Sequence, residues 1–238
     1  MSVTTTRSDR PKLLDLYCGQ CGAGWGYELA GFAVTGVDIR PMELIPPDIE
    51  FVHADAITYL REHGHEYDAI HASPVCRAHT VARNSAPVRY QHEDHIPALR
   101  EALADLWRRG HHVPYVIENV PGAPLKDPVE LCGAMFGLPT YRHRLFEFGG
   151  VVKPVPPPHP QHVHKVAPMG RRPGPGEFWS IAGNFSGVDE ASRAMGMPWA
   201  NQDGLRQAIP PAYTYWVGVH LLHQHRFRRC RKTAKVAA

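Results

Sequence analysis

The chain begins with an apolar run that leads directly into a glycine-rich turn and then into a helical segment. Residues 12–17 read KLLDLY, and the next nine residues read CGQCGAGWG. After the turn, Trp25, Leu29 and Phe32 have the spacing of one helix face, and we expect this helix to end near Gly31. A strand, a glycine-rich turn and a helix in this order form the opening unit of a doubly wound α/β fold.

Four further apolar runs follow and are interpreted as strands. They cover residues 33–39, 50–57, 67–73 and 113–119. Residues 94–109 carry apolar side chains at helical spacing, with Pro97 in the first turn and Gly110 as a stop. Strands that alternate with helices predict a doubly wound, mostly parallel sheet, whose ligands bind beyond the carboxyl ends of the strands. Two of the runs are expected to stop at acids, Asp38 and Asp55.

Composition sets the broad class of the protein. A chain of 238 residues with 43% hydrophobic residues can bury one sizeable core. No apolar run approaches the roughly 20 residues that cross a bilayer, and the first residues lack a secretion signal. We therefore expect a cytoplasmic monomer that does not contact a membrane. The five cysteines stand at irregular positions, which predicts reduced thiols.

The last third of the chain changes in character. Residues 151–176 contain eight prolines and no acid, which predicts an irregular lobe. Residues 223–235 hold six Lys or Arg and no acid, so this tail is either a solubilising end or an arm that contacts phosphates. We divide the chain into a cofactor-binding and catalytic domain (1–148), a small lobe (149–206), and a returning helix with the basic tail (207–238).

The glycine-rich turn predicts a nucleotide-like ligand. Glycines after a first strand let a ligand approach the backbone, and an acid about 20 residues later can hold a ribose hydroxyl pair. Asp38 stands at that position. The pattern does not separate a dinucleotide site from an S-adenosylmethionine site, or either from a structural turn. Cys18 and Cys21 form a CxxC, but no second pair follows at zinc spacing, so we expect no metal.

Two later motifs carry reactive groups. SPVCRAHT places Cys76 in a turn after a strand, close to Arg77 and His79, whose charges would favour the thiolate that a nucleophilic attack needs. A lone cysteine is more often buried packing. ENV places Glu118 at the end of another strand. A protonated Glu118 could donate a hydrogen bond to a ring nitrogen while the thiolate adds to the ring.

With these motifs in order, the chain resembles the cytosine carbon-5 methyltransferases, which use S-adenosylmethionine and usually act on DNA. The resemblance covers nearly the whole chain. It also includes YRHRLFEF at residues 141–148 and QAIPPAY at residues 207–213.

The resemblance implies a catalytic set. Cys76 would add to carbon 6 of cytosine, and Glu118 would contact ring nitrogen 3 and the exocyclic amine. Arg144 would hold the base carbonyl, with Arg142 as a supporting cation, and Asn119 would brace the cysteine loop. A cytosine inside a duplex would have to be flipped out to reach these groups.

The resemblance also implies the residues that hold S-adenosyl-L-methionine. Tyr17 would lie against the adenine, Asp38 would take the ribose hydroxyls, and Asp55 would take the adenine amine. The other implied cofactor-binding residues are Asp15, Cys18, Gly19, Gly22, Gly24, Ile39, Ala56, Pro74 and Gln207.

Some positions depart from the family pattern. Val75 and Arg77 stand where proline and glutamine usually flank the nucleophile, and Cys21 replaces a glycine of the turn, where a side chain restricts the backbone. Thr140 and Gln207 replace a glutamine and an asparagine. Because the resemblance places the last motif beside the cofactor, the use of a modified sulfonium donor stays an open alternative.

The region for target recognition is short, as in stand-alone phage or prophage enzymes, which predicts short or relaxed specificity. Residues 170–187 mix cations with aromatics that could follow a phosphate backbone and stack a base, and the alternative is a surface loop. The candidate DNA contacts are Arg77, Arg171, Arg172, Arg228 and Arg229.

Four functions therefore stay open. The leading one is methylation of cytosine in DNA, and the second is the same chemistry on RNA, as in the tRNA-methylating branch of the family. The third is a nucleic-acid-binding relative without turnover. The fourth is an enzyme that modifies a free cytidine nucleotide.

Overall fold

The computed structural model describes residues 6–75 and 94–236, except for the side chains of residues 226–236. Within these residues, one sheet of seven strands has the order β3-β2-β1-β4-β5-β7-β6, and β7 is antiparallel to both of its neighbours. The strands are β1 (Lys12–Leu16), β2 (Ala33–Asp38), β3 (Glu50–His53), β4 (Ala69–Ala72), β5 (Tyr115–Asn119), β6 (Val129–Leu131) and β7 (Arg144–Gly149). This topology confirms the predicted doubly wound, mostly parallel sheet.

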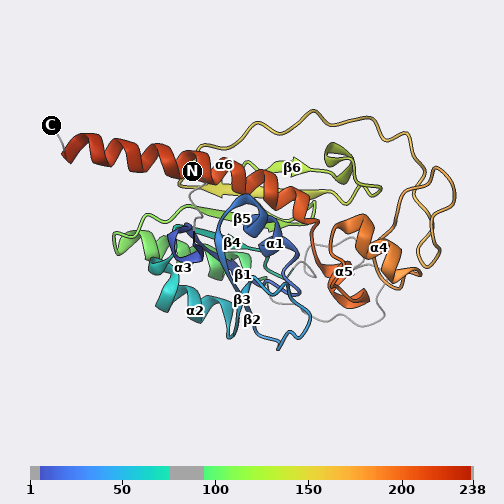
Figure 1. Cartoon of the computed structure of the whole chain (residues 1–238), viewed down its shortest axis with the longest axis horizontal. Coiled ribbons are helices and arrows are strands. Elements are labelled where there is room, and N and C mark those ends of the chain that lie inside the picture. The colour runs from blue at the N-terminus through green and yellow to red at the C-terminus, as the bar shows by residue number, and fades with distance from the viewer. Residues whose placement is uncertain (1–5, 76–93, 237–238) are drawn as a thin grey trace.

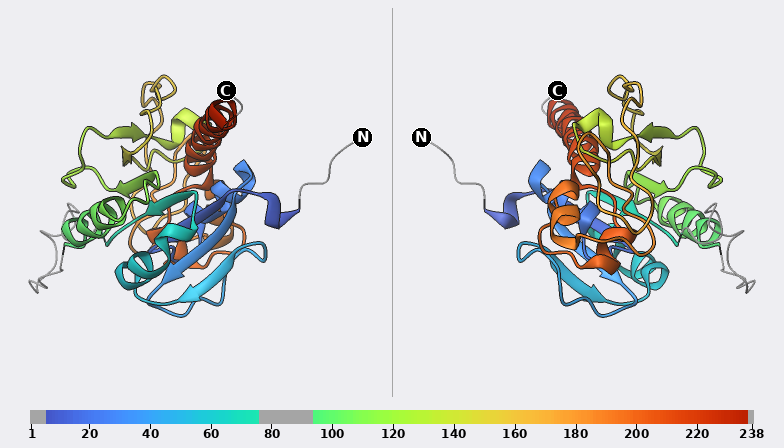
Figure 2. Two further views of the ribbon diagram at one scale, coloured as in Figure 1. Left: turned by 90° about the vertical axis from the view of Figure 1, so that its left-hand side faces the viewer. Right: turned by 90° about the vertical axis from the view of Figure 1, so that its right-hand side faces the viewer.

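Helices cover both faces of the sheet (Figures 1 and 2). The helices α1 (Gly22–Ala30) and α6 (Pro211–Val236) lie on one face, and α2 (Ala56–His63) and α3 (Ile96–Arg108) lie on the other. The pleat of β1 explains the two layers, because neighbouring side chains point to opposite faces. Leu13 packs in the core with Tyr27 and Tyr213, whereas Leu14 packs with Leu60 and Leu103.

The predicted strand over residues 50–57 is wrong in its second half. β3 ends at His53, and Asp55 is the N-cap of α2. The Asp55 Oδ1 atom accepts hydrogen bonds from Thr58 N and Thr58 Oγ1, both at 2.8 Å. A side-chain acceptor three residues before a free N–H starts a helix more effectively than it extends a strand.

The C-terminal helix is longer than predicted. Within residues 207–238 we expected a returning helix followed by a separate basic tail, but α6 continues through that tail to Val236. Among the described helices, none has an apolar stretch long enough to span a membrane.

The lobe after β7 has a long irregular segment and then two short helices. In residues 151–187, the described chain forms an isolated bridge between Val166 and Phe178. The helices α4 (Val188–Met195) and α5 (Gln202–Gln207) then enclose a small core that includes Ile181, Met195 and Leu205. Figure 1 shows α4 and α5 beside the sheet, at the end where α6 begins.

The helices α1 and α6 approach each other closely at a glycine. A Cβ atom on Gly26 would lie 2.1 Å from Thr214 Oγ1 and 2.2 Å from the Pro211 carbonyl oxygen. Thr214 is fully buried, and its hydroxyl donates to the Ala23 carbonyl at 2.8 Å. This part of the glycine-rich motif therefore serves helix packing rather than ligand binding.

Gly26→Ala should lower the free energy of unfolding by about 1–3 kcal/mol, because the added methyl group forces α1 and α6 apart. Urea denaturation measures the change. Leu29→Ala is the matched control: Leu29 is 55% exposed on the same helix, so its loss should cost less than about 0.5 kcal/mol. Equal effects of the two changes would contradict the packing argument.

Candidate cofactor and catalytic site

The turn after β1 holds three residues in the left-handed backbone region. Tyr17, Gly19 and Cys21 have φ angles of 60°, 50° and 57°. A side chain at such a φ is strained, which bears on Cys21, where the related family usually has glycine. The bent backbone aims the N–H of Gly19 at Asp38 Oδ2, at 3.0 Å.

Asp38 ends β2 and is held by backbone donors. Its Oδ1 atom accepts from the N–H of Arg40 at 2.9 Å, in addition to the Gly19 contact at Oδ2. The Arg40 guanidinium lies 3.6 Å from Asp38 Oδ1 and donates to Gln207 Oε1 at 3.3 Å. These contacts bring the glycine turn, the end of β2 and the last sequence motif together at one edge of the sheet.

Asp15 lies in β1 below this turn and is completely buried. Within the described part of the chain, neither of its carboxyl oxygens has a hydrogen-bonding partner. Burial is the main cause that raises the pKa of Asp15 to about 8. The charges of Asp38 and Glu118 act in the same direction, and the backbone N–H of Gly24 opposes the shift without reaching hydrogen-bond geometry. Because Gly24 has no side chain, it leaves space for this carboxyl group: a Cβ on Gly24 would lie only 2.9 Å from Asp15 Oδ2.

The residues expected to contact the adenine differ in their exposure and in their hydrogen bonds. Ile39 directly follows Asp38 and is 67% exposed, so it offers an apolar surface beside the acid. Tyr17 is half-buried, and its hydroxyl lies 3.4 Å from His95 Nδ1. Asp55 uses Oδ1 to cap α2, and these hydrogen bonds lower its pKa. Ala56 is buried in the first turn of that helix.

The two thiols of the turn pack inward. Cys18 and Cys21 are buried, and a Cβ on Gly36 of β2 would lie 3.0 and 3.1 Å from their Sγ atoms. A hydrogen bond with Cys21, together with burial, raises the pKa of Cys18. Among the described residues, no third metal ligand lies within binding distance of this pair.

Glu118 and Arg144 form a buried ion pair between β5 and β7. Arg144 Nε lies 3.1 Å from Glu118 Oε1, although the angle is not that of a hydrogen bond. Burial raises the pKa of Glu118, and Arg144, a hydrogen bond from Ser73 and Arg142 oppose the shift. Burial outweighs these opposing effects, so the pKa of the carboxyl group is raised.

A buried hydrogen-bonded chain supports Ser73. His71 Nε2 lies 3.0 Å from Ser73 Oγ, and His71 Nδ1 lies 2.9 Å from the Tyr27 hydroxyl. Burial lowers the pKa of His71 to about 3, so this imidazole is neutral at pH 7. The sequence pattern gave no sign of this chain, because its members come from α1 and β4.

Asn119 connects β5 to the cysteine loop. Its Nδ2 donates to the Pro74 carbonyl at 3.0 Å, and its Oδ1 accepts from the N–H of Val120 at 2.9 Å. Cys76 and Arg77 follow Pro74 but lie outside the described residues.

Arg142 has a structural role that the sequence analysis missed. Its guanidinium donates to the carbonyl oxygens of Ala208, Ile181 and Arg206 at 2.8, 2.7 and 2.8 Å. It therefore ties the lobe and the end of α5 to the segment before β7. Its own carbonyl accepts from the Tyr213 hydroxyl at 2.9 Å.

Gln20 was also missed, although it stands inside the glycine-rich motif. Its carbonyl accepts from Trp199 Nε1 at 2.8 Å, and its Oε1 accepts from the N–H of Asn201 at 3.1 Å. Gly204 packs on the Gln20 side chain with no room for a Cβ. Through these contacts, the lobe holds the glycine-rich turn in place.

The candidate nucleic-acid contacts of the lobe already have acidic partners. Arg171 forms an ion pair with Glu177, and Arg172 Nη1 lies 3.1 Å from Glu190 Oε1. Exposed pairs of this kind contribute about 0–1 kcal/mol, so phosphates could compete for them. The side chains of Arg228 and Arg229 lie outside the described part of α6.

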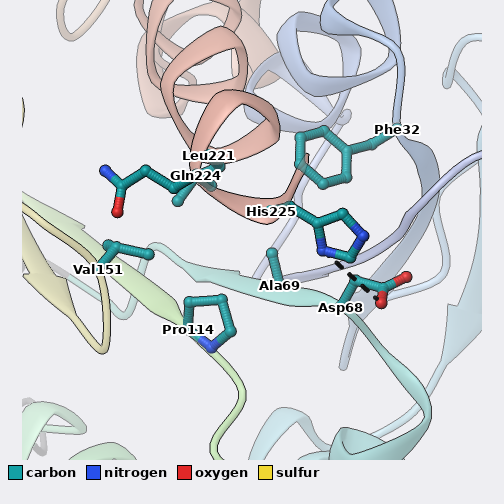
Figure 3. A pocket seen from close by; sticks show the side chains of 8 residues that line it. All are labelled: Phe32, Asp68, Ala69, Pro114, Val151, Leu221, Gln224 and His225. Carbon is teal, nitrogen blue, oxygen red and sulfur yellow. Dashed lines mark ion pairs between the residues drawn. The ribbon is translucent and has the colours of Figure 1, made fainter. Parts of the chain in front are cut away.

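A surface hollow elsewhere is not part of this site. Figure 3 shows it beneath α6, beside Asp68 and Ala69 at the start of β4 and Pro114 before β5. His225 Nδ1 lies 4.0 Å from Asp68 Oδ1 at its rim. This hollow faces the amino ends of the strands, whereas Asp38 and Glu118 stand at the carboxyl ends.

The raised pKa of Asp15 predicts that the unliganded protein loses stability as the pH rises. The folded state keeps this proton up to about pH 8, whereas the unfolded chain releases it near pH 3.8, so stability falls across that window. His71 acts in the opposite direction, but only between about pH 3 and its ordinary value of 6.5.

Between pH 6.5 and 8, the free energy of unfolding should therefore decline less steeply with rising pH in Asp15→Asn than in wild type. One proton contributes at most about 1.4 kcal/mol per pH unit to this slope. Urea titrations across this range measure the slope. Asp48→Asn is the control, because Asp48 is exposed, and it should leave the slope unchanged. Equal slopes in wild type and Asp15→Asn would mean that Asp15 is ionised in the folded state.

Comparisons with solved structures show which fold this is. The Dnmt2 methyltransferase of S. pombe aligns with a TM-score of 0.59 at 14% sequence identity, over 90% of this chain and 99% of that chain. Two further structures align less well. A DNMT2 mutant of Spodoptera frugiperda has a TM-score of 0.43 at 17% identity, over 74% of this chain and 56% of that chain. The methyltransferase EhMeth of Entamoeba histolytica has a TM-score of 0.48 at 10% identity, over 90% of this chain and 98% of that chain. No family model matches the sequence, and no curated protein matches it. The S. pombe alignment shows that the chain has the Rossmann-like fold of a methyltransferase.

Proposed function

We propose that the chain is an S-adenosylmethionine-dependent methyltransferase that methylates carbon 5 of cytosine in DNA. The observation that carries this proposal is the buried pair of Glu118 and Arg144, held 3.1 Å apart beside the segment that leads to Cys76. Asn119 joins Glu118 to that segment through its hydrogen bond to Pro74. An acid and a guanidinium at one sheet edge, together with the thiol that follows Pro74 two residues later in the sequence, could recognise and attack a pyrimidine ring.

The residues at the glycine turn fit the cofactor. Asp38 can accept ribose hydroxyls through its remaining lone pairs, and the exposed Ile39 can cover the adenine. Asp15 is a buried acid without a partner among the described residues, so a nearby ammonium group would relieve its burial. Asp55 retains Oδ2 for the adenine amine, because its cap uses Oδ1. When bound, the cofactor would supply an electrophilic methyl group.

The protein's own groups would activate the cytosine. Burial favours the neutral form of Glu118, which can donate its proton toward ring nitrogen 3. The Cys76 thiolate would form a bond to carbon 6 while the electrons of the carbon 5–carbon 6 double bond move into the ring. Carbon 5 then becomes nucleophilic. After methylation, the carbon 5 proton passes to solvent, nitrogen 3 returns its proton to Glu118, and the carbon–sulfur bond breaks, which restores the ring and the thiolate.

Arg144 and the buried chain behind Ser73 would position this acid. Arg144 can hold the base carbonyl while it lies beside Glu118, since the guanidinium has further donors. Neutral His71 lets Ser73 keep its hydrogen bond to Glu118. Arg142 would act as a supporting cation, because its charge lowers the pKa of Glu118 while three carbonyl oxygens fix its guanidinium.

Methylation of RNA is the second candidate. The site recognises an extruded base, which DNA and RNA share, so the polymer would be selected by the lobe and the helix that carries the basic tail. The deciding experiment offers unmodified DNA and unmodified tRNA, with labelled S-adenosylmethionine, to the same preparation. Base-resolution mapping of 5-methylcytosine follows. Transfer to DNA supports the proposal, transfer to tRNA alone moves it to RNA, and transfer to neither substrate rules out turnover.

Cys76→Ser should abolish methyl transfer, while cofactor affinity stays near that of the wild type, because the glycine turn is a separate element. DNA containing 5-fluorocytosine should trap the wild-type protein covalently, since fluorine cannot leave as a proton does. Denaturing electrophoresis detects the adduct. Cys230→Ser is the matched control and should remain active. Substantial turnover in Cys76→Ser, or an active protein that forms no adduct, would exclude the covalent mechanism.

Asp38→Ala should weaken S-adenosylmethionine binding by about 1–3 kcal/mol, because the ribose hydroxyls lose a charged acceptor and the N–H of Gly19 loses its partner. Calorimetry measures the affinity. The exposed Asp48 provides the control change Asp48→Ala, which should bind normally. Tight binding of a nicotinamide dinucleotide without binding of S-adenosylmethionine would instead assign the turn to a dehydrogenase-type site.

A further inference from the structure

Four metal-ligating side chains converge on the side of β7 away from the glycine turn. We call Cys132, His143, His159 and His162 the Cys132 cluster. One ligand atom of each lies within 4.8 Å of all the others. Cys132 Sγ is 3.4 Å from His162 Nε2, and His143 Nε2 is 3.2 Å from His159 Nε2.

Two of these separations match edges of a zinc tetrahedron. With zinc–nitrogen bonds of about 2.05 Å and zinc–sulfur bonds of about 2.3 Å, the ligand atoms lie about 3.3 Å (nitrogen to nitrogen) and about 3.6 Å (sulfur to nitrogen) apart. The two shortest contacts of the cluster lie within about 0.2 Å of these values. Two separate hydrogen bonds would explain each contact alone, but they would not require all four atoms to converge on one point.

We propose that the Cys132 cluster binds one zinc ion. One thiolate with three imidazoles is a donor set that zinc favours, whereas calcium and magnesium prefer oxygen. Four protein ligands leave no open position for substrate, so this site would be structural. Cys132 would release its proton to solvent when the metal binds. Glu130 Oε1, 4.0 Å from His143 Nε2, adds negative charge near the ion.

The position of the cluster shows what the metal would hold together. Cys132 is buried directly after β6, and His143 directly precedes β7. His159 and His162 are exposed in the proline-rich segment, where the described chain has no helix or strand. Such a segment has few hydrogen bonds of its own. A zinc ion would therefore cross-link it to the β6–β7 hairpin.

Aromatic stacking already preforms this arrangement. The ring of His162 stacks on Tyr141 with centroids 3.6 Å apart, and His143 stacks on His159 at 5.4 Å. The Tyr141 hydroxyl also donates to the His164 carbonyl at 3.0 Å, which fixes the segment on the other side of His162. Preformed ligands reduce the ordering that metal binding must impose.

The sequence pattern predicted no metal, because no second ligand pair follows Cys18 and Cys21 at zinc spacing. A pattern of Cys132, His143 and then HPQH at residues 159–162 carries the needed ligand types, with a spacing that only the hairpin brings together. The proposal is independent of methyl transfer, since none of the four residues belongs to the catalytic or cofactor set.

The test measures the metal content of untagged, full-length protein by inductively coupled plasma mass spectrometry. Wild type should carry about one zinc ion per chain. The variant with His159→Ala and His162→Ala should lose zinc by roughly tenfold or more. The exposed pair His65 and His111, whose rings lie 5.2 Å apart, provides the matched control: His65→Ala with His111→Ala should retain the metal.

Cobalt substitution tests the ligand set directly. Cobalt-loaded wild type should show the visible bands of a tetrahedral site and a thiolate charge-transfer band. Cys132→Ser should lose the charge-transfer band. If Cys132→Ser prevents folding, the variant with His159→Ala and His162→Ala still tests the ligand set, because both histidines are exposed. A chelator should lower the Tm of wild type but not that of the double histidine variant.

Wild type that stays free of zinc after incubation with excess zinc chloride would overturn the proposal. Retention of stoichiometric zinc by the double histidine variant would overturn it as well.

Discussion

Three acids stand toward the carboxyl ends of the parallel strands β2, β1 and β5, and the site depends on how their charges are accommodated. Asp38 receives two backbone N–H groups, so it can stay ionised at the edge of the sheet. Glu118 receives Arg144 and Ser73 in a buried setting that still raises its pKa. Asp15 has no such partner among the described residues and takes up a proton instead, with a pKa of about 8. Buried acids in one sheet cannot all be charged, and this sharing assigns each a different chemistry.

The lobe and the C-terminal helix hold the elements that carry these acids in position. Gly26 lets α1 lie directly against α6, and Gln20 is fixed from outside by Trp199 and Asn201. The guanidinium of Arg142 reaches three carbonyl oxygens in the lobe, at the end of α5 and just before α6. The short lobe is therefore part of the scaffold for the cofactor turn, in addition to any role in recognising a polymer.

Local patterns in the sequence predicted the features that local physics determines. The alternation of strands and helices, the stop at Gly31 and the place of Asp38 at a strand end follow from periodicity and turn chemistry, and the structure has all three. The strand predicted over residues 50–57 was too long, because Asp55 is both a plausible strand end and a strong N-cap. The Arg142 contacts and the Cys132 cluster were missed, since their members meet only through a hairpin and an irregular segment whose path no periodicity encodes.

Three consecutive residues before and within β7 point in three directions, which links the lobe to Glu118, the proposed catalytic acid. Arg142, with a φ of 33°, reaches the lobe, His143 joins the Cys132 cluster, and Arg144 meets Glu118. A non-glycine residue at positive φ is strained, and it persists only where its surroundings fix it. Here the surroundings are the carbonyl oxygens around the guanidinium of Arg142 and the Tyr213 hydroxyl at its carbonyl. Because Arg144 follows within two residues, any loosening of the lobe or the cluster would change the angle at which its guanidinium approaches Glu118. The irregular lobe thus bears on the chemistry without contacting the base.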